Sequence, residues 1–519
     1  MFSLQPADAS RQSKSTNQPD LFMIPSLFAA LLSAFLLILS SPGMNLGFCA
    51  WFALVPLLYA VHINPGRALH LGFLSGLVYY TFLVHWVTIS LGNYGHLPWW
   101  LTFPALILLA AYMSLYTSLF CWLLSRIKKI NPVWTAPFFW VGLDYLRGIL
   151  FTGFPWQDLG YTQFNIPEFI QVADLAGHHG VTFLLVLANS FFFILFTRRQ
   201  FLPLAYALVI FIASGSYSFV RIHMLEEHAN TLPTIATSII QPNIEQDQKW
   251  RPENRKTAID AHILLSNQAV ADKKIDLVIW PETAIPILGS DKMEFTEILE
   301  QTVKSHNYAL LSGIPFSSLS NGKRHFYNSA ILFTPDGSRE VYNKQHLVPF
   351  GEYIPLGDKL SFFAPLVESV GNFSAGQTST PLTGPKADIG ILICFESIFP
   401  ELARIQVENG ANLLVNITND AWFGRSNASI QHLAMAVFRA VENRRSLARS
   451  ANTGISCFVK PTGHIVQATS LFTPCFISEH LPLVQQKTFF NRIGYLFPLL
   501  CLFLCLSFVC LSLLMRKKR

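Results

Sequence analysis

A series of long apolar segments constrains the fold of this chain more than any other feature. Eight segments are close to the length of about 20 residues that crosses the hydrocarbon core of a membrane as a helix. We expect membrane spans at 21–40, 45–62, 71–93, 98–125, 133–150, 178–197, 200–220 and 494–515. The first has no small-residue cleavage site and is followed at once by further spans, so we interpret it as an anchor. The sequence therefore predicts a multi-pass membrane protein.

The stretch from about 221 to 490 has the mixed composition of a globular domain and is long enough for one hydrophobic core. Hydrophobic residues make up 51% of the chain and charged residues 13%, against roughly 25% charged residues in soluble domains. These values average two unlike parts. We predict a membrane bundle of seven spans at 1–220, a globular domain at 221–490 and a last span with a basic tail at 491–519.

Among the short segments that flank the predicted spans, basic residues lie on only one side of the membrane. Twelve occupy the short segments on that side: Arg11, Lys14, Arg67, Arg126, Lys128, Lys129, Arg198, Arg199, Arg516, Lys517, Lys518 and Arg519. The short segments on the other side, at about 41–44, 94–97 and 151–177, contain none. Short cytoplasmic segments are enriched in Lys and Arg, so we expect both termini in the cytoplasm and the 221–490 domain outside. Because much of the basic charge flanks apolar segments, the net charge of +6 does not indicate nucleic-acid binding.

One pair of ionisable residues lies within a predicted span. Asp144 and Arg147 are three residues apart, on one face of the helix expected at 133–150. Charged groups at membrane depth usually face a partner or a water-filled cavity. The pair is consistent either with a polar contact that holds two helices together or with the lining of such a cavity.

The globular stretch alternates short apolar runs with helical segments. We expect strands at Ile235–Ile240, Ile275–Trp280, Ala309–Ile314, Tyr327–Phe333, Ile389–Ile393, Asn412–Ile417 and Ile455–Val459. Helices are expected at about 291–305, 397–409 and 428–449, with turns at Pro335–Gly337 and Pro461–Gly463. This order predicts a layered α/β fold with buried strands.

Reactive side chains follow the ends of several expected strands. Glu282 comes two residues after one strand, and Cys394 directly follows another and precedes a helical segment. Lys344 and Glu352 lie between these two positions in the chain. Sites in open α/β folds gather at the carboxyl ends of strands, and a thiolate is stabilised at a helix N-terminus. We therefore expect a thiol-based site.

The pattern alone also allows each of these residues a non-catalytic role. Cys394 could be a small buried hydrophobic residue, Glu282 a solvated loop acid and Lys344 a surface cation. Five of the eight cysteines lie in predicted spans, so they do not form a disulfide framework. Three remain in the globular domain, and an odd number leaves at least one free thiol unless two chains are linked.

These motifs together resemble the nitrilase superfamily, which carries a Glu–Lys–Cys triad in that chain order. The matching stretches are Trp280-Pro-Glu282, Asn343-Lys344 with Gly351-Glu352-Tyr353, and Cys394-Phe-Glu396. With seven spans before the domain and one after it, the chain is similar to the apolipoprotein N-acyltransferase family. Other similar stretches are Asp144–Gly148, Gly153–Trp156, Gln241–Asn243, Tyr327–Ser329 and Asn419–Phe423. Two departures are visible, since Phe395 stands where the family often has Tyr and Asp144 where it often has Glu.

The resemblance implies an α-β-β-α sandwich joined to a bundle of about eight membrane helices, in a bacterial inner membrane. It implies transfer of an acyl chain from a phospholipid to the N-terminal amine of a diacylglyceryl apolipoprotein, without metal or cofactor. Glu282 is then expected to be the general base, Cys394 the nucleophile that carries a thioester, and Lys344 the oxyanion-stabilising group. Expected supporting residues are Glu352, which would orient Lys344, and Glu396. Expected substrate contacts are Trp250, Asn328, Phe395, Trp422 and Phe423; ordinary aromatic packing is an equal alternative for Trp250, Trp422 and Phe423.

Two other functions fit parts of the pattern. A membrane-tethered amidohydrolase would use the same triad with water as acceptor, although seven spans exceed what tethering needs. A transporter with an outer binding domain would be expected to show an internal repeat of its spans, and the sequence shows none.

Overall fold

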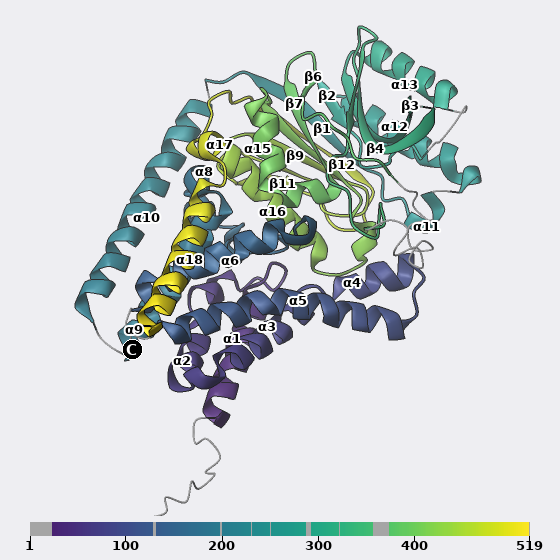
Figure 1. The fold of residues 1–519 in the computed structure, drawn as a ribbon. Coiled ribbons are helices and arrows are strands. Elements are labelled where there is room, and N and C mark those ends of the chain that lie inside the picture. The colour runs from purple at the N-terminus through teal and green to yellow at the C-terminus, as the bar shows by residue number, and fades with distance from the viewer. Residues whose placement is uncertain are drawn as a thin grey trace, which may run out of the picture.

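The computed structural model describes residues 23–127, 131–197, 200–229, 231–249, 251–286, 292–320, 322–355 and 373–517. Helices from the N-terminal half form one body, and a two-sheet domain lies against it (Figure 1). The last helix, α18 (Leu496–Lys517), returns from the two-sheet domain to the helical body beside α6 (Ala136–Ile149). The chain therefore begins and ends its described part in the helical body.

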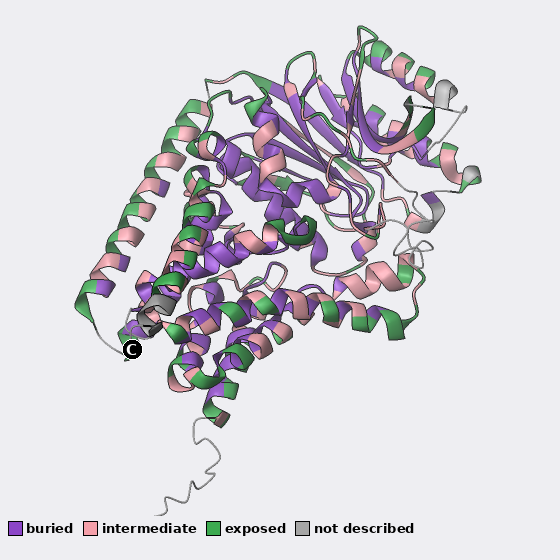
Figure 2. Cartoon of the chain, viewed as in Figure 1, coloured by how far each residue is buried: buried purple, intermediate pink, exposed green. Residues whose placement is uncertain are grey.

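All eight segments predicted to span a membrane contain helix. Four helices are long and apolar enough to cross it: α1 (Met23–Ser40), α5 (Trp99–Arg126), α9 (His178–Thr197) and α10 (Phe201–Ala229). Large apolar side chains on α10, including Phe201, Val209 and Phe219, are exposed, as expected for a face in contact with lipid (Figure 2). These helices give the described chain the character of a membrane protein.

The exact number of eight spans is not confirmed, because several helices are short or bent. Residues Gly47–Ile63, which include α2 (Val55–Ile63), meet Pro65–Leu83, which includes α3 (Ala68–Leu83), at an angle of 109°. The two could form one broken span or a re-entrant loop, where the sequence predicted two separate spans. Helix α6 has 14 residues, which rise about 21 Å and fall short of a hydrocarbon core of about 30 Å.

The two-sheet domain consists of two six-stranded mixed sheets. The order in the first is β12-β1-β2-β3-β4-β5, with β1, β2 and β3 parallel. The order in the second is β11-β10-β9-β8-β7-β6, with β7, β8 and β9 parallel. The bounds are β1 Thr234–Gln241, β2 Leu277–Ile279, β3 Ala309–Ser320, β4 Lys323–Phe333, β5 Arg339–Asn343, β6 Leu382–Thr383, β7 Asp388–Ile393, β8 Leu413–Thr418, β9 Ser446–Ala451, β10 Cys457–Val459, β11 Ile465–Ala468 and β12 Cys475–Pro482.

The domain has four layers, and an apolar core lies between each pair of neighbouring layers or covers the outer face of a layer. Inward side chains such as Leu277, Ile391 and Val415 join the two sheets. Helices α12 (Arg255–Val270) and α13 (Lys292–His306) cover the outer face of the first sheet, and α15 (Pro400–Glu408) and α16 (Ala428–Asn443) cover the second. The strands are apolar on both faces because each sheet is covered on both sides. The result is the expected α-β-β-α sandwich (Figure 1).

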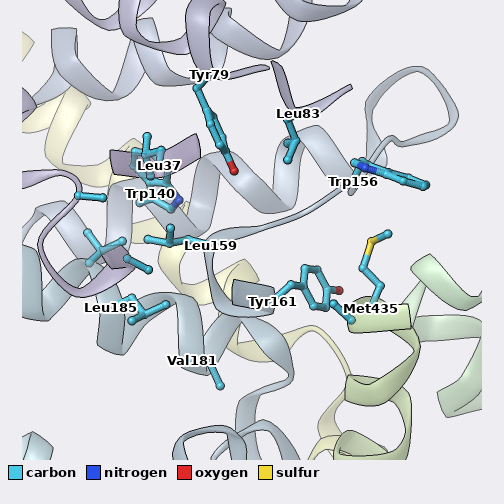
Figure 3. Close-up of a cluster of buried hydrophobic side chains, with 14 of the residues drawn as sticks. Leu37, Tyr79, Leu83, Trp140, Trp156, Leu159, Tyr161, Val181, Leu185 and Met435 are labelled. Carbon is cyan, nitrogen blue, oxygen red and sulfur yellow. The ribbon is translucent and has the colours of Figure 1, made fainter. Parts of the chain in front are cut away.

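The second helical layer and the membrane helices share one core. Figure 3 shows this cluster, in which Tyr79, Trp140 and Leu185 come from membrane helices and Met435 comes from α16. The ring of Tyr161, in the loop after α6, lies 5.0 Å from that of Phe438 on α16. The sandwich is therefore packed onto the bundle through α16.

The prediction of a helix at 428–449 is wrong at its end. Helix α16 stops at Asn443, and Ser446–Ala451 form β9 between β8 and β10. Arg444 adopts a left-handed conformation (φ 50°), which ends the helix. The remaining expected strands and helices are present with shifted bounds, whereas β5, β6, β9, β11 and β12 were not predicted from the sequence.

Candidate active site

Three strand ends bring the predicted reactive residues to the sandwich. Lys344 directly follows β5 and Cys394 directly follows β7, so the two sheets each contribute one of them. Glu282 follows β2 through a turn that packs on Gly313 of β3. A Cβ at Gly313 would lie 2.4 Å from the nitrogen of Thr283 and 2.7 Å from the Cα of Glu282. Only glycine lets this turn approach the strand so closely.

A compact polar cluster joins Lys344 to two carboxylates. The Lys344 Nζ atom lies 2.9 Å from Glu352 Oε1 and 3.9 Å from Glu282 Oε1. The Asn328 amide donates to both carboxylates, at 2.7 Å to Glu282 Oε1 and 2.8 Å to Glu352 Oε1. All four side chains are buried. Asn328 therefore braces the two carboxylates, and a contact of this residue with substrate stays a prediction.

The second oxygen of Glu282 distinguishes it from Glu352. Glu352 Oε2 accepts the Val348 N–H at 2.8 Å, which anchors that carboxylate to the chain. Glu282 Oε2 is buried and has no hydrogen-bond partner among the described residues. A carboxylate oxygen that accepts no hydrogen bond has its lone pairs available to a neighbouring proton donor. This atom is suited to general-base chemistry.

The electrostatics keep the lysine charged and the cysteine neutral. Burial lowers the pKa of Lys344, but Glu352 and Glu282 outweigh it and hold the pKa above its usual range. Burial raises the pKa of the Cys394 thiol, the charge of Glu282 raises it further, and Lys344 acts in the opposite direction. A thiol of this kind is scarcely ionised at neutral pH, so it needs a base at the moment of attack.

The backbone at Cys394 is a sharp turn between β7 and the 3₁₀ helix η9 (Cys394–Ile398). Cys394 has a φ of 51° and its side chain is partly exposed. The buried Glu396 carboxylate accepts the Ile393 N–H at 2.7 Å and, across the site, the Gln345 N–H at 2.7 Å. Burial raises the pKa of Glu396 to about 7, against the effect of these donors. Glu396 thus ties the cysteine turn to the segment that follows Lys344.

The expected substrate contacts divide into packed and partly exposed side chains. Phe395 packs edge-on against Phe399, with ring centroids 5.2 Å apart. Phe423 packs edge-on against both Trp86 and Trp156 of the membrane part, with ring centroids 4.8 and 5.9 Å away. Trp422 is half-buried against Tyr94 at 5.3 Å. Trp250 lies outside the described residues. Lipid contact by these side chains stays a prediction.

Two buried polar networks were not predicted from the sequence. Behind Cys394, His432 lies between the cysteine turn and the Asp420–Arg449 ion pair. Lys249, whose pKa is lowered to about 8 by burial, donates to the main-chain oxygen of Glu282 at 2.9 Å. In the sequence, the only signal for these two contacts is that His432 and Lys249 are basic residues. Each of them bonds to a residue more than 30 positions away in the chain.

The second network lies between the sandwich and the membrane bundle. Asp158 accepts from Arg147 and from His178 Nε2 at 2.7 Å, and Glu442 lies 3.3 Å from His178 Nδ1. Arg147 also lies 3.6 Å from Asp144, so the pair noted in the sequence holds a loop to its helix. Asp158, His178 and His179 have the ligand types of a metal site, which the sequence did not predict. The Arg147 charge on Asp158 identifies the cluster as an ion-pair network.

Comparisons with known proteins cover both parts of the chain. Residues 33–191 match the family described as Apolipoprotein N-acyltransferase N-terminal domain, and residues 236–484 match Carbon-nitrogen hydrolase. A curated apolipoprotein N-acyltransferase from Geobacter metallireducens is 39% identical and covers 93% of this chain and 95% of its own. One from Haemophilus ducreyi is 31% identical, with 94% and 97% covered.

Solved structures that resemble this chain cover about half of it. A carbon-nitrogen hydrolase from Helicobacter pylori is 19% identical, with a TM-score of 0.38, and covers 48% of this chain and 89% of its own. The full-length matches decide the family, because they include the membrane part. The chain belongs to the apolipoprotein N-acyltransferases, enzymes of lipoprotein N-acylation with a carbon-nitrogen hydrolase domain.

Proposed function

We propose that this enzyme takes an acyl chain from a membrane phospholipid, holds it as a thioester on Cys394, and passes it to the N-terminal amine of an S-diacylglyceryl-cysteine apolipoprotein. Glu282, Lys344 and Cys394 carry the reaction. Glu352 holds Lys344 in place, at 2.9 Å, and Glu396 holds the cysteine turn. The reaction exchanges an ester for an amide in two steps that share one base.

In the first step, Glu282 takes the proton from the Cys394 thiol and the sulfur attacks the ester carbonyl of the phospholipid. The negative charge that develops on the carbonyl oxygen is stabilised by the Lys344 ammonium and the Cys394 backbone N–H. The carbon–oxygen bond then breaks, and the lysophospholipid alkoxide leaves with the proton held by Glu282. A thioester on Cys394 and a neutral leaving alcohol result.

In the second step, the α-amino group of the acceptor attacks the thioester. Glu282 takes a proton from the amine, Lys344 again stabilises the oxyanion, and the carbon–sulfur bond breaks. The Cys394 thiolate leaves and recovers the proton from Glu282. The products are an N-acyl amide and the free enzyme, with atoms and charges balanced.

The contact between the membrane bundle and the site supports lipid substrates, and it distinguishes this enzyme from a soluble amidohydrolase. The segment of the bundle that precedes α5 contacts the loop beside the cysteine turn. The Ser90 hydroxyl donates to the Trp422 main-chain oxygen at 2.8 Å, and Trp86 packs on Phe423 at 4.8 Å. A reactive thiol beside membrane-embedded helices supports substrates that arrive laterally from the bilayer.

The lipoprotein substrate requires the domain to face outward. We propose that 221–490 is extracytoplasmic, between a bundle at 1–220 and a last span at 491–519, with both termini in the cytoplasm. The uneven distribution of Lys and Arg supports this orientation. Reporter fusions at Arg199 and after Arg519 should read cytoplasmic and one near Ser320 external. A cytoplasmic signal at Ser320 would overturn the orientation and the substrate.

The deciding assay supplies the purified full chain with phospholipid and a diacylglyceryl peptide. Mass spectrometry should find the peptide acylated on its α-amino group and an equal amount of lysophospholipid. Continuous release of free fatty acid, with the peptide unchanged, would identify a hydrolase and contradict the proposal. Binding without chemical change would support a transporter instead.

A further inference from the structure

The carbonyl oxygen of Cys394 receives two side-chain hydrogen bonds from behind the site. His432 Nε2, on α16, lies 3.0 Å from this oxygen, and the Ser397 hydroxyl donates to it at 3.0 Å. The His432 ring is buried, and its Nε2 also lies 2.9 Å from Ser397 Oγ. These contacts place an imidazole against the main chain of the predicted nucleophile.

The surroundings of His432 decide which of its nitrogens carries a proton. Nδ1 faces Asp420 Oδ1 at 3.1 Å and Arg449 Nη2 at 3.1 Å. A carbonyl oxygen only accepts, so the nitrogen that faces Cys394 must be protonated. In the neutral ring, Nδ1 accepts from Arg449; in the charged ring, Nδ1 donates to Asp420. Nε2 therefore donates to the cysteine carbonyl in both charge states.

The ring is held rigidly by its neighbours. Arg449 Nη2 donates to Asp420 Oδ2 at 2.8 Å, which completes the contact on the Nδ1 side. Trp156, in the loop after α6, stacks on the His432 ring, with centroids 6.1 Å apart and planes at 28°. The Trp156 Nε1–H also donates to Gln431 Oε1 at 2.8 Å, beside His432 on α16. The membrane part therefore helps to fix the imidazole.

A fixed carbonyl constrains the whole turn. In a trans peptide the C=O and the following N–H point in opposite directions. Holding the Cys394 oxygen toward α16 therefore fixes the direction of the Phe395 N–H and the ψ angle of Cys394. The φ of 51° at Cys394 is a strained conformation for a residue other than glycine. Such strain persists only where the surroundings hold it in place.

We propose that His432 is a positioning residue for acyl transfer: its Nε2–H holds the Cys394 carbonyl and so keeps the nucleophile turn in its strained, attacking conformation. The imidazole exchanges no proton with substrate and does not touch the reacting atoms. The inference rests on the proposed role of Cys394 as nucleophile. It adds a route by which the membrane part, through Trp156, supports the geometry of the thiol.

Two substitutions of matched length test the donor. His432→Gln keeps an N–H at the same number of bonds from the backbone, whereas His432→Met keeps the length and removes the donor. The single-turnover rate of Cys394 acylation, the KM for phospholipid and thermal unfolding are measured for the full chain. We expect His432→Met to slow acylation about ten- to a hundredfold, as loss of a buried hydrogen bond implies, with KM unchanged. We expect His432→Gln to recover most of the rate.

The remaining donor provides a second test, which stands even if His432→Met does not fold. Ser397→Ala should have a small effect while His432 is present, and a larger one in a His432→Leu background, which lacks the ring donor, because both side chains serve one carbonyl. Strict additivity would contradict the proposal, as would normal acylation in His432→Met or equal losses in folded His432→Gln and His432→Met. If the wild-type chain forms no thioester, the proposed function fails and the role of His432 fails with it. A thioester that forms equally fast in the wild-type chain and in every folded variant contradicts the role of His432 alone.

Discussion

Two regions of this molecule bury several charges, and we propose that only one of them carries out chemistry. At the junction with the membrane bundle, both oxygens of Asp158 are occupied, one by Arg147 and one by His178. In the sandwich, Glu352 and Glu282 share the single ammonium of Lys344, and Glu282 keeps one oxygen without a partner among the described residues. Asp158 thus has a partner on each oxygen, whereas Glu282 keeps an acceptor in a cluster whose charges act on the partly exposed Cys394 thiol.

The difference teaches that burial and charge alone do not identify a catalytic site. Arg444, which joins α16 to the bundle, is as deeply buried as Lys344 and lies 2.9 Å from Asp174. Its other donors are taken by Gln171 and Pro461, so the guanidinium has only structural partners. Changes in the sandwich cluster should therefore lower turnover, whereas changes at the junction should lower stability.

The largest effect is expected from the three predicted reactive residues. Glu282→Gln, Lys344→Met and Cys394→Ala should each lower N-acylation at least about a thousandfold, because groups that act as a unit fail together. Thermal unfolding should show folded protein in each case. Cys475→Ala, at a partly exposed thiol of the same domain, is the matched control and should retain activity. Near-normal turnover in Lys344→Met would show that a group other than Lys344 stabilises the oxyanion.

The second-largest effect is expected at the junction between α16 and the membrane bundle, and it is an effect on stability. Arg444→Met should lower the free energy of unfolding by about 3 kcal/mol, because the buried oxygens of Gln171 and Pro461 lose their donor and Asp174 keeps only Arg221 as a cation. Turnover per folded molecule should be retained. Arg339→Met, which removes an exposed ion pair with Glu300, should cost no more than about 1 kcal/mol. Equal stability of the two variants, in denaturant titrations, would contradict the comparison.

A smaller loss is expected at Glu352, which holds Lys344 without facing the thiol. Glu352→Gln keeps the side-chain volume and a hydrogen bond while removing the charge. We expect kcat to fall about ten- to a hundredfold. The substitution weakens a charge-assisted hydrogen bond to Lys344 but removes no reacting group. Steady-state assays against the wild-type chain measure this. Activity as low as that of Lys344→Met would mean that Glu352 takes part in the reaction itself.

The smallest effect concerns the pKa of the Cys394 thiol. Glu282 raises this pKa and Lys344 lowers it, so Glu282→Gln should shift the thiol pKa down and Lys344→Met should shift it up. More thiolate should then form at a given alkaline pH in the first variant and less in the second, although both lose acyl transfer. The pH dependence of alkylation at Cys394, followed by peptide mass, measures this. Shifts of the same sign would show that the two charges do not act on the thiol.

Local patterns in the sequence were sufficient to predict the strands that precede Glu282 and Cys394, whereas β5, which precedes Lys344, was not predicted. Each of the two predicted strands is marked by an apolar run that leads to a reactive residue, which is a local signal. The same signal failed at Ser446–Ala451, where a strand was taken for helix. There the decisive force is pairing with β8, whose residues lie some 30 positions earlier in the chain. Tertiary pairing overrides local propensity in such segments.

The polar contacts around the site were beyond sequence reasoning for the same reason. Asn328 was expected to touch substrate, and it also bridges Glu282 and Glu352. His432 had no motif to mark it, because its partners Cys394 and Arg449 come from other elements of the sandwich. The number of membrane crossings depends on the angle between neighbouring helices, such as the 109° bend before α3, which composition does not encode.

The central claim, that Cys394 carries the acyl group between two lipids, is tested most directly by the mass of the intact enzyme. Phospholipid alone should add one fatty acyl group, which hydroxylamine removes and which is absent in Cys394→Ala. The thioester should persist, because an apolar site keeps water from it, until a diacylglyceryl peptide discharges it. An unmodified enzyme that still acylates the peptide, or an adduct that persists in Cys394→Ala, would contradict the account.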